Sequence, residues 1–428
     1  MESSSRSSSR RRWLLWPEQG PKNGEKITDR FSPVIDRFRP AGDIISENLG
    51  LEDTTVEELA KDIDVIVNIA ATTNFYERYD VSLDVNVMGV KHLCQFAKQC
   101  AKLKMFMQVS TAYVSGERAG LIRENPIKPG DSLQEGTYLD IDAELRFVRE
   151  AKKELLLLLP LNAGDDAKKA GRKAMKELGI QRARHFGWPN TYVFTKAMGE
   201  MLLGQLRGDM PVVIMRPSII TSVQAEPLPG WMQGTRTIDT FIIGYAKQEL
   251  SCVLADLSIV ADVIPGDMVE KGAQAVYHAT SSLGNPATYA MIYEAVLRHF
   301  YQNPRMGKNG EVIPTKELYF FTTITRFCLF MFLAYKLPLE ILHLVNLLLC
   351  GLFSNLYNDM NRKYKYVMLL ADIYRPFAFF QGCYDEMNLE RLRSKMTMKT
   401  PEDQMFNFDT RPSNGKSIST KFTYLAFS

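Results

Sequence analysis

The feature that most constrains the fold is a series of short apolar runs separated by helical patterns. Residues 64–71 (DVIVNIAA), 104–110 (KMFMQVS) and 211–216 (PVVIMR) have the nearly continuous apolar character of strands buried on both faces of a parallel sheet. Helical patterns at 81–100 and 192–207 lie between them, and this alternation predicts right-handed βαβ units. The expected fold class is therefore α/β, with a doubly wound parallel sheet of the Rossmann type.

Two segments depart from this alternation and suggest a division into domains. Residues 139–184 are charged and helical in pattern, with a break at 162–164, and indicate a helical insertion outside the sheet. After about Lys316 the chain becomes strongly apolar. We expect a disordered N-terminal segment, a reductase domain containing the insertion, a mostly helical C-terminal domain and an atypical tail. Their bounds are 1–38, 39–316, 317–409 and 410–428.

The apolar segment 318–353 raises the question of membrane contact. Five residues interrupt it, so no uninterrupted apolar stretch reaches the roughly 18 to 20 residues that a spanning helix needs. We expect two amphipathic helices on either side of Pro338 that either contact a membrane surface peripherally or pack together. The interrupting residues are Arg326, Lys336, Pro338, Glu340 and His343.

Charge and residue counts exclude several classes of function. A formal net charge of +3 gives no field that favours nucleic acid, so no nucleic-acid partner is expected. The six cysteines lack C-x-x-C spacing, which favours a reduced, intracellular setting, and the five histidines form no H-x-x-x-H pair, so no metal is expected. Residues 1–16, rich in Ser and Arg, overlap in composition with organelle transit peptides but lack the apolar core of a secretory signal.

The residues that suggest chemistry are Tyr192 and Lys196, which share one face of a helix. A nearby ammonium stabilises the phenolate and brings a tyrosine pKa of about 10 toward neutrality, so that the phenol can protonate a carbonyl oxygen during hydride transfer. One Tyr-x-x-x-Lys match among 18 tyrosines is about what chance gives. The context adds weight, because residues 109–116 (VSTAYVSG) put hydroxyls at the carboxyl end of a strand, where ligands bind in parallel sheets.

In this context the chain resembles the extended short-chain dehydrogenase/reductases, and most closely the plant alcohol-forming fatty acyl-CoA reductases. The resemblance covers residues from about 42 to about 408. The segments that carry it, in order, are 42–44 (GDI), 68–71 (NIAA), 86–89 (NVMG), 109–116, 192–196 (YVFTK), 216–218 (RPS), 229–232 (PGWM) and 262–269 (DVIPGDMV).

The resemblance implies a reaction and a set of site residues. The substrate would be a long-chain acyl-CoA, reduced by NADPH through an aldehyde to a primary alcohol, at the surface of the endoplasmic reticulum or, alternatively, in a plastid. The implied catalytic residues are Tyr192, Lys196 and Thr111. The implied cofactor-binding residues are Asp43, which would reach the adenine, and Ala70, Ala71, Asn86, Ser110, Lys196 and Pro217.

The N-terminal region departs from the family pattern. Family members begin with a strand and a T-G-x-x-G-x-x-A turn, whose helix N-terminus holds the pyrophosphate. We do not find this turn, and residues 13–16 are too short for the strand because Pro17 follows at once. We therefore expect the strand at 39–44 to lose its neighbours and the strand at 64–71 to present an unpaired edge. We also expect this chain to bind NADPH weakly and not to reduce acyl-CoA.

Two alternatives remain open at this stage. Another extended reductase, acting on a sterol, a flavonoid or a nucleotide sugar, would use the same Tyr192 and Lys196, although it would not need the apolar region after Lys316. A catalytically inactive acyl- or membrane-binding relic would explain the unrecognised glycine turn. A substrate panel separates the reductases, and NADPH titration tests the relic.

Overall fold

The structure is a computed structural model that describes residues 13–15, 42–158, 165–221, 237–265, 276–306 and 309–395. In the described residues, the central sheet has five parallel strands in the order β1-β2-β3-β5-β9. This arrangement, with helices packed against the sheet, confirms the expected α/β class. The strands are β1 (Trp13–Leu15), β2 (Val65–Asn68), β3 (Met105–Val109), β5 (Val212–Pro217) and β9 (Val276–Ala279).

The N-terminal edge of the sheet differs from the expectation. The strand at 64–71 is not left unpaired, because Trp13 pairs with Val65 and Leu15 with Val67 in a parallel register. A three-residue segment is enough, since ladder pairing requires only extended backbone, and Pro17 lies beyond the paired residues. In the strand expected at 39–44, residues 39–41 lie outside the described part, and 42–44 lead into a turn.

The helices expected around the sheet are confirmed. A continuous helical run follows β2, and its middle turn is a π-helix. In α7, Gly199 allows close approach to that run, because a Cβ there would lie 2.4 Å from the Asn86 carbonyl oxygen. The elements are α2 (Asp53–Asp62), α3 (Tyr79–Leu83), η3 (Asp84–Met88), α4 (Gly89–Ala97) and α7 (Thr191–Leu206).

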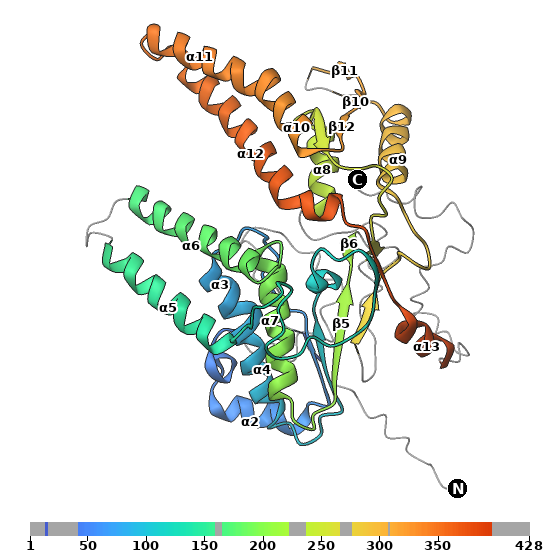
Figure 1. Cartoon of the computed structure of the whole chain (residues 1–428). Helices are drawn as coiled ribbons and strands as arrows, with labels where there is room; N and C mark the ends of the chain where they lie inside the picture. The colour runs from blue at the N-terminus through green and yellow to red at the C-terminus, as the bar shows by residue number, and fades with distance from the viewer. Residues whose placement is uncertain are drawn as a thin grey trace.

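The helical insertion is also confirmed. It forms two helices, α5 (Ile141–Leu158) and α6 (Asp165–His185), which project together from the sheet domain (Figure 1). The break expected at 162–164 lies outside the described residues.

The remaining described elements before α10, together with the C-terminal β13 and α13, lie outside the central sheet. Two 3-10 segments are η2 (Glu47–Gly50) and η4 (Ala112–Ser115), and the helices are α8 (Thr237–Ala246), α9 (Tyr289–Gln302) and α13 (Met387–Lys395). The strands pair as β4 (Gly120–Ile122) with β13 (Gly382–Tyr384), β6 (Ile219–Thr221) with β8 (Val263–Pro265), β7 (Cys252–Leu254) with β12 (Tyr319–Phe321), and β10 (Arg305–Met306) with β11 (Val312–Ile313).

The apolar C-terminal segment is one long helix, not two. Its parts α10 (Ile324–Met331), η6 (Phe332–Lys336) and α11 (Leu337–Leu348) run without a break. Pro338 does not end the helix because it follows the π-helical η6 and lies in the first turn of α11, where its ring and lacking N–H are tolerated.

This continuity changes the comparison with a membrane span. The helix Ile324–Leu348 has 25 residues, a mean hydropathy of 1.7 over its most apolar window, and only 11% of that window buried. It is therefore long and apolar enough to cross a membrane, contrary to the expectation from its interruptions. After it, α12 (Ser354–Ala378) returns to the body, and the two helices form a projecting hairpin (Figure 1).

Candidate active site

The expected catalytic pair lies at the start of α7, beside the carboxyl end of β3. The Asn190 side chain accepts a hydrogen bond from the Val193 backbone N–H at 3.0 Å, which fixes the first turn of the helix. Lys196 is buried, and its Nζ donates to the Val109 carbonyl at 2.6 Å. Tyr192, one turn earlier, is half-buried. The Tyr/Lys helix is thus attached directly to the strand end that carries Ser110 and Thr111.

The hydroxyls after β3 differ in how they are satisfied. Thr111 Oγ1 donates to the Pro217 carbonyl and accepts from the Tyr113 N–H, both at 3.4 Å. This contact brings the ends of β3 and β5 together. The Ser110 hydroxyl is buried and has no hydrogen-bond partner among the described residues. Because an unpaired buried hydroxyl is costly, this position suits a polar ligand.

The loop after β2 is held beside the same edge by Asn86 of η3. Asn86 Oδ1 accepts from the Thr72 N–H at 3.0 Å, and Nδ2 donates to Thr195 Oγ1 at 2.9 Å. Thr195 precedes Lys196 on α7, so Asn86 connects the loop with the Tyr/Lys helix. Ala70 of this loop is buried, and Ala71 is half-buried.

Asp43 lies in the segment that leads to η2. Its Oδ1 accepts the Ile45 N–H at 3.1 Å. The neighbouring Ile44 packs against Gly89, where a Cβ would come within 2.8 Å of Ile44 Cγ1. The backbone carbonyl of Ile44 is hydrogen-bonded to His92 Nδ1 at 3.0 Å. These contacts set Asp43 against α4, the helix that continues from the turn carrying Asn86.

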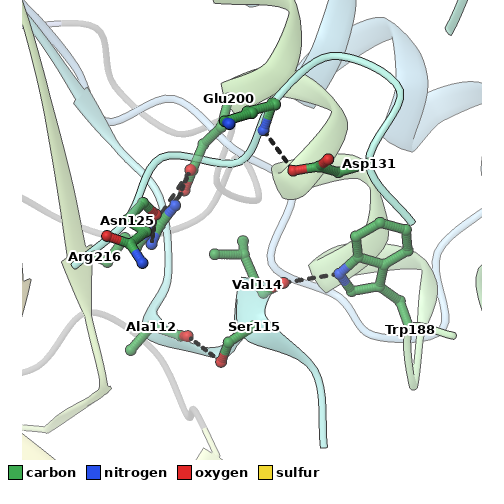
Figure 2. Close-up of polar contacts among 9 residues, drawn as sticks. Ala112, Val114, Ser115, Asn125, Asp131, Trp188, Glu200 and Arg216 are labelled. Atoms are coloured by element: carbon green, nitrogen blue, oxygen red, sulfur yellow. Dashed lines mark hydrogen bonds and ion pairs between the residues drawn. The ribbon is translucent and has the colours of Figure 1, made fainter. Parts of the chain in front are cut away.

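A buried ion pair that the sequence did not suggest anchors α7 to β5. Arg216 donates from Nε to Glu200 Oε1 at 3.0 Å and from Nη2 to Oε2 at 2.6 Å, and its Nη1 donates to the Asn125 carbonyl at 2.9 Å (Figure 2). Both side chains are almost fully buried. The sequence offered one clue that Glu200 belongs to this region, because it lies four residues after Lys196 and so shares the helix face of Tyr192 and Lys196.

The segment after Thr111 is fixed in the same region. The Trp188 indole donates to the Val114 carbonyl at 2.8 Å, and the Ser115 hydroxyl donates to the Ala112 carbonyl at 3.1 Å (Figure 2). These contacts hold η4 against the residues that precede α7. The position of α7 relative to the end of β3 is therefore fixed by the Glu200–Arg216 pair and by the Trp188–Val114 hydrogen bond.

Several ionisable groups beneath the site have a structural role. Burial, with a contribution from Arg216, lowers the pKa of His278 to about 3. Burial also raises the pKa of Glu124 to about 7, and its carboxylate accepts the backbone N–H groups of His278 at 2.9 Å and Asn388 at 2.7 Å. These bonds join β9 to α13. The described residues contain no cluster of His, Cys, Asp and Glu suited to a metal ion.

Asp262, from the segment 262–269, is also buried, and burial raises its pKa. Its carboxylate accepts the backbone N–H groups of Ser281 at 2.8 Å and Ser282 at 3.2 Å. The rest of that motif after Pro265, and the segment 229–232, lie outside the described residues.

A second feature that sequence did not reveal is an apolar cavity, partly open to solvent, between α8, α9, α12 and the β7/β12 pair. Tyr374 and Phe377 of α12 line it, and both contact Phe75, with ring centroids 5.6 and 5.2 Å apart. Phe75 in turn stacks on Tyr192 at 5.6 Å and an interplanar angle of 16°. One wall of the cavity is therefore a single aromatic ring away from the candidate catalytic phenol.

Comparison with known proteins identifies the family. An NAD-binding profile described as "Male sterility protein" matches residues 20–273, and a second profile of the same description, Sterile, matches residues 334–422. The chain is 43% identical to "Fatty acyl-CoA reductase 1" of Arabidopsis thaliana, over 86% of this chain and 77% of the relative. The chain belongs to the fatty acyl-CoA reductase family. It is also 44% identical to "Alcohol-forming fatty acyl-CoA reductase" of Simmondsia chinensis, over 89% and 79% of the two chains.

Family membership confirms the resemblance found in the sequence and does not favour the sterol, flavonoid or nucleotide-sugar alternatives. The profile matches begin at residue 20 and end at residue 422, so they extend beyond the 42–408 range recognised from motifs. Among solved structures, the terminal R domain of the myxalamid PKS-NRPS pathway has a TM-score of 0.49 and 15% identity, over 90% of this chain and 73% of that one.

Proposed function

We propose that this fatty acyl-CoA reductase converts long-chain acyl-CoA to the primary alcohol with NADPH as the reductant. The observation that carries the proposal is the apolar cavity whose wall residues Tyr374 and Phe377 contact Phe75, the ring that stacks on Tyr192. A cavity lined by aliphatic and aromatic side chains suits an acyl chain, and we propose that the polar end of that chain lies toward the Tyr192 phenol. The names of the relatives, which include an alcohol-forming reductase, support the same substrate and product.

The cofactor proposal is supported by the carboxyl edge of the sheet, where doubly wound folds bind dinucleotides. The unpartnered Ser110 hydroxyl and the loop that Asn86 holds fit a nicotinamide nucleotide. NADPH, when bound, supplies the hydride. We propose that Asp43 faces its adenine and that the remaining contacts come from Ala70, Ala71, Asn86, Ser110, Lys196 and Pro217.

The protein's own groups would handle the proton and the developing charge. Tyr192 donates a proton to the thioester carbonyl oxygen, and Lys196 stabilises the phenolate that remains. Thr111 donates a hydrogen bond to the same oxygen, exchanging the long 3.4 Å contact with Pro217 for a stronger one. The resulting hemithioacetal would release coenzyme A as the free thiol, with its hydroxyl proton passing to sulfur. Once Tyr192 regains a proton from water, it could protonate the aldehyde oxygen as hydride is transferred from a second NADPH, which gives the alcohol.

We also propose a division of labour between residues 39–316 and 317–409. The first part binds the cofactor and contains α8 and α9, whereas the second contributes α12, so both parts line the cavity. The exposed apolar helix Ile324–Leu348 supports contact of the second part with a membrane. We place this contact at the endoplasmic reticulum surface, with a plastid membrane as the alternative.

The test is turnover of a long-chain acyl-CoA with NADPH by Tyr192→Phe and Lys196→Ala. Because no T-G-x-x-G-x-x-A turn is found in the sequence, the assay uses both this chain and a fusion that carries an added N-terminal strand and T-G-x-x-G-x-x-A turn. We expect each variant to lose roughly 100-fold to 10,000-fold in rate while acyl-CoA binding is retained.

Exposed Tyr301, on α9, provides the matched control as Tyr301→Phe, which should leave the rate unchanged. Turnover within tenfold of the unsubstituted protein in either Tyr192→Phe or Lys196→Ala would contradict the assignment.

A further inference from the structure

The far end of the α11/α12 hairpin has an unusual surface for a helical turn. Residues 341–358, which form the end of α11, the turn and the start of α12, contain no Asp, Glu, Lys or Arg. Leucines cover this end, and Leu348 and Leu352 are 82% and 74% exposed. The other exposed large apolar residues there are Ile341, Leu344, Val345, Leu347, Leu349 and Leu356.

The backbone of the turn is satisfied from within. The Gly351 N–H donates to the Asn346 carbonyl at 2.8 Å, and the Phe353 N–H donates to Asn346 Oδ1 at 2.7 Å. Asn346 Nδ2 donates to the Ser354 hydroxyl at 3.2 Å, and this hydroxyl donates to the Gly351 carbonyl at 2.7 Å. Internal pairing of this kind is what a segment needs to leave water for hydrocarbon without losing hydrogen bonds.

Charged residues begin nearer the turn on α12 than on α11. On α11 the nearest is Glu340, paired with Lys336, and on α12 it is Asp359, paired with Arg362 and Lys363. From Glu340 to the end of α11, eight residues rise about 12 Å at 1.5 Å each. Half of a hydrocarbon core of about 30 Å is about 15 Å. On α12, the five-residue step from Ser354 to Asp359 rises only about 7.5 Å. The uncharged end therefore fits within the depth of one leaflet.

We propose that residues 341–358 insert as a hairpin into one leaflet of a lipid bilayer, with the charged residues at the headgroups. A full crossing is disfavoured, because α12 would carry Asp359, Arg362, Lys363 and Lys365 into the core. Four basic residues (Lys336, Arg362, Lys363, Lys365) against two acidic ones (Glu340, Asp359) favour an anionic leaflet. The inference refines the proposed membrane contact and does not depend on catalysis.

The test uses the exposed Cys350 at the turn, since the other five cysteines are buried or partly buried. An environment-sensitive fluorophore on Cys350 is mixed, in the full chain, with phosphatidylcholine vesicles containing a minor fraction of phosphatidylserine and lipids that carry a quencher at set depths. The control protein is the double variant Lys168→Cys/Cys350→Ser, which carries the fluorophore at exposed position 168 of α6, in the helical insertion. We expect the Cys350 label to be quenched most by deep quenchers and the α6 label not to be quenched.

Vesicle flotation of Leu348→Asp/Leu352→Asp completes the experiment. Both sites are exposed, so the fold should persist, and partitioning should fall by more than about 100-fold because two apolar side chains are replaced by charges. Leu157→Asp, at an 85% exposed leucine of α5, should bind vesicles like the unsubstituted chain.

The proposal would be overturned if Leu348→Asp/Leu352→Asp floated with vesicles like the unsubstituted chain. It would also be overturned if a quencher sealed inside the vesicles reached the Cys350 label, or if residues 341–358 mediated dimerisation in lipid-free solution instead. Flotation is independent of reductase activity, so an inactive protein that passes these tests refutes the proposed function and leaves the hairpin assignment intact.

Discussion

Breaking the buried Glu200–Arg216 pair should destabilise the protein more than any exposed ion pair would. In Glu200→Ala, Arg216 loses its carboxylate partner and keeps the bond to the Asn125 carbonyl, while its guanidinium remains buried. Leaving one charge of a buried pair without its partner costs about 3 to 5 kcal/mol. Against a total stability of about 5 to 15 kcal/mol, this loss should be evident as a large fall in the urea unfolding midpoint.

A double-variant cycle separates the ion pair from simple loss of packing. Glu200→Leu/Arg216→Met removes both charges and should cost less than Glu200→Ala alone, because no unpaired charge stays buried. The exposed pair Lys173–Glu177 on α6 is the matched control, and Glu177→Ala there should cost at most about 0.5 kcal/mol. A loss below about 1 kcal/mol for Glu200→Ala, or a double variant that costs the sum of its singles, would refute the reasoning.

Two further predictions concern the rings and the buried imidazole. Phe75→Ala removes the ring between Tyr192 and the cavity, and we expect kcat/KM for long-chain acyl-CoA to fall about three- to tenfold, the value of one aromatic stacking contact. An unchanged kcat/KM across chain lengths would contradict a role for Phe75. His278 is buried with a pKa of about 3, below its usual 6.5, so it contributes stability that is present above pH 6.5 and lost as the pH falls toward 3, at up to about 1.4 kcal/mol per pH unit. His278→Gln should flatten the dependence of unfolding free energy on pH between 6.5 and 5, and a parallel dependence in both proteins would show that other groups cause it.

The sequence by itself determined the elements whose signals are local. Continuous apolar runs predicted β2, β3 and β5, and 3.6-residue periodicity predicted α7 and the α5/α6 insertion. The placement of Tyr192 and Lys196 on one helix face was also local, since a spacing of four residues fixes it. Ordered motifs along the chain were sufficient to suggest the family that the comparisons established.

The tertiary structure decided features that depend on partners distant in sequence. Whether Trp13–Leu15 forms a strand depends on the free edge of β2, and local length and Pro17 argued misleadingly against it. The helix Ile324–Leu348 continues through Pro338 because a π-helical turn precedes it. The rule that proline ends a helix does not take such a turn into account.

The site itself shows the same limit most clearly. Phe75 meets Tyr192, Tyr374 and Phe377 because the loop after β2, the start of α7 and the end of α12 converge, and no periodicity relates these positions. Side-chain packing between segments up to about 300 residues apart is selected by the whole core, so only the folded chain reveals the cavity one aromatic ring away from the candidate catalytic Tyr192.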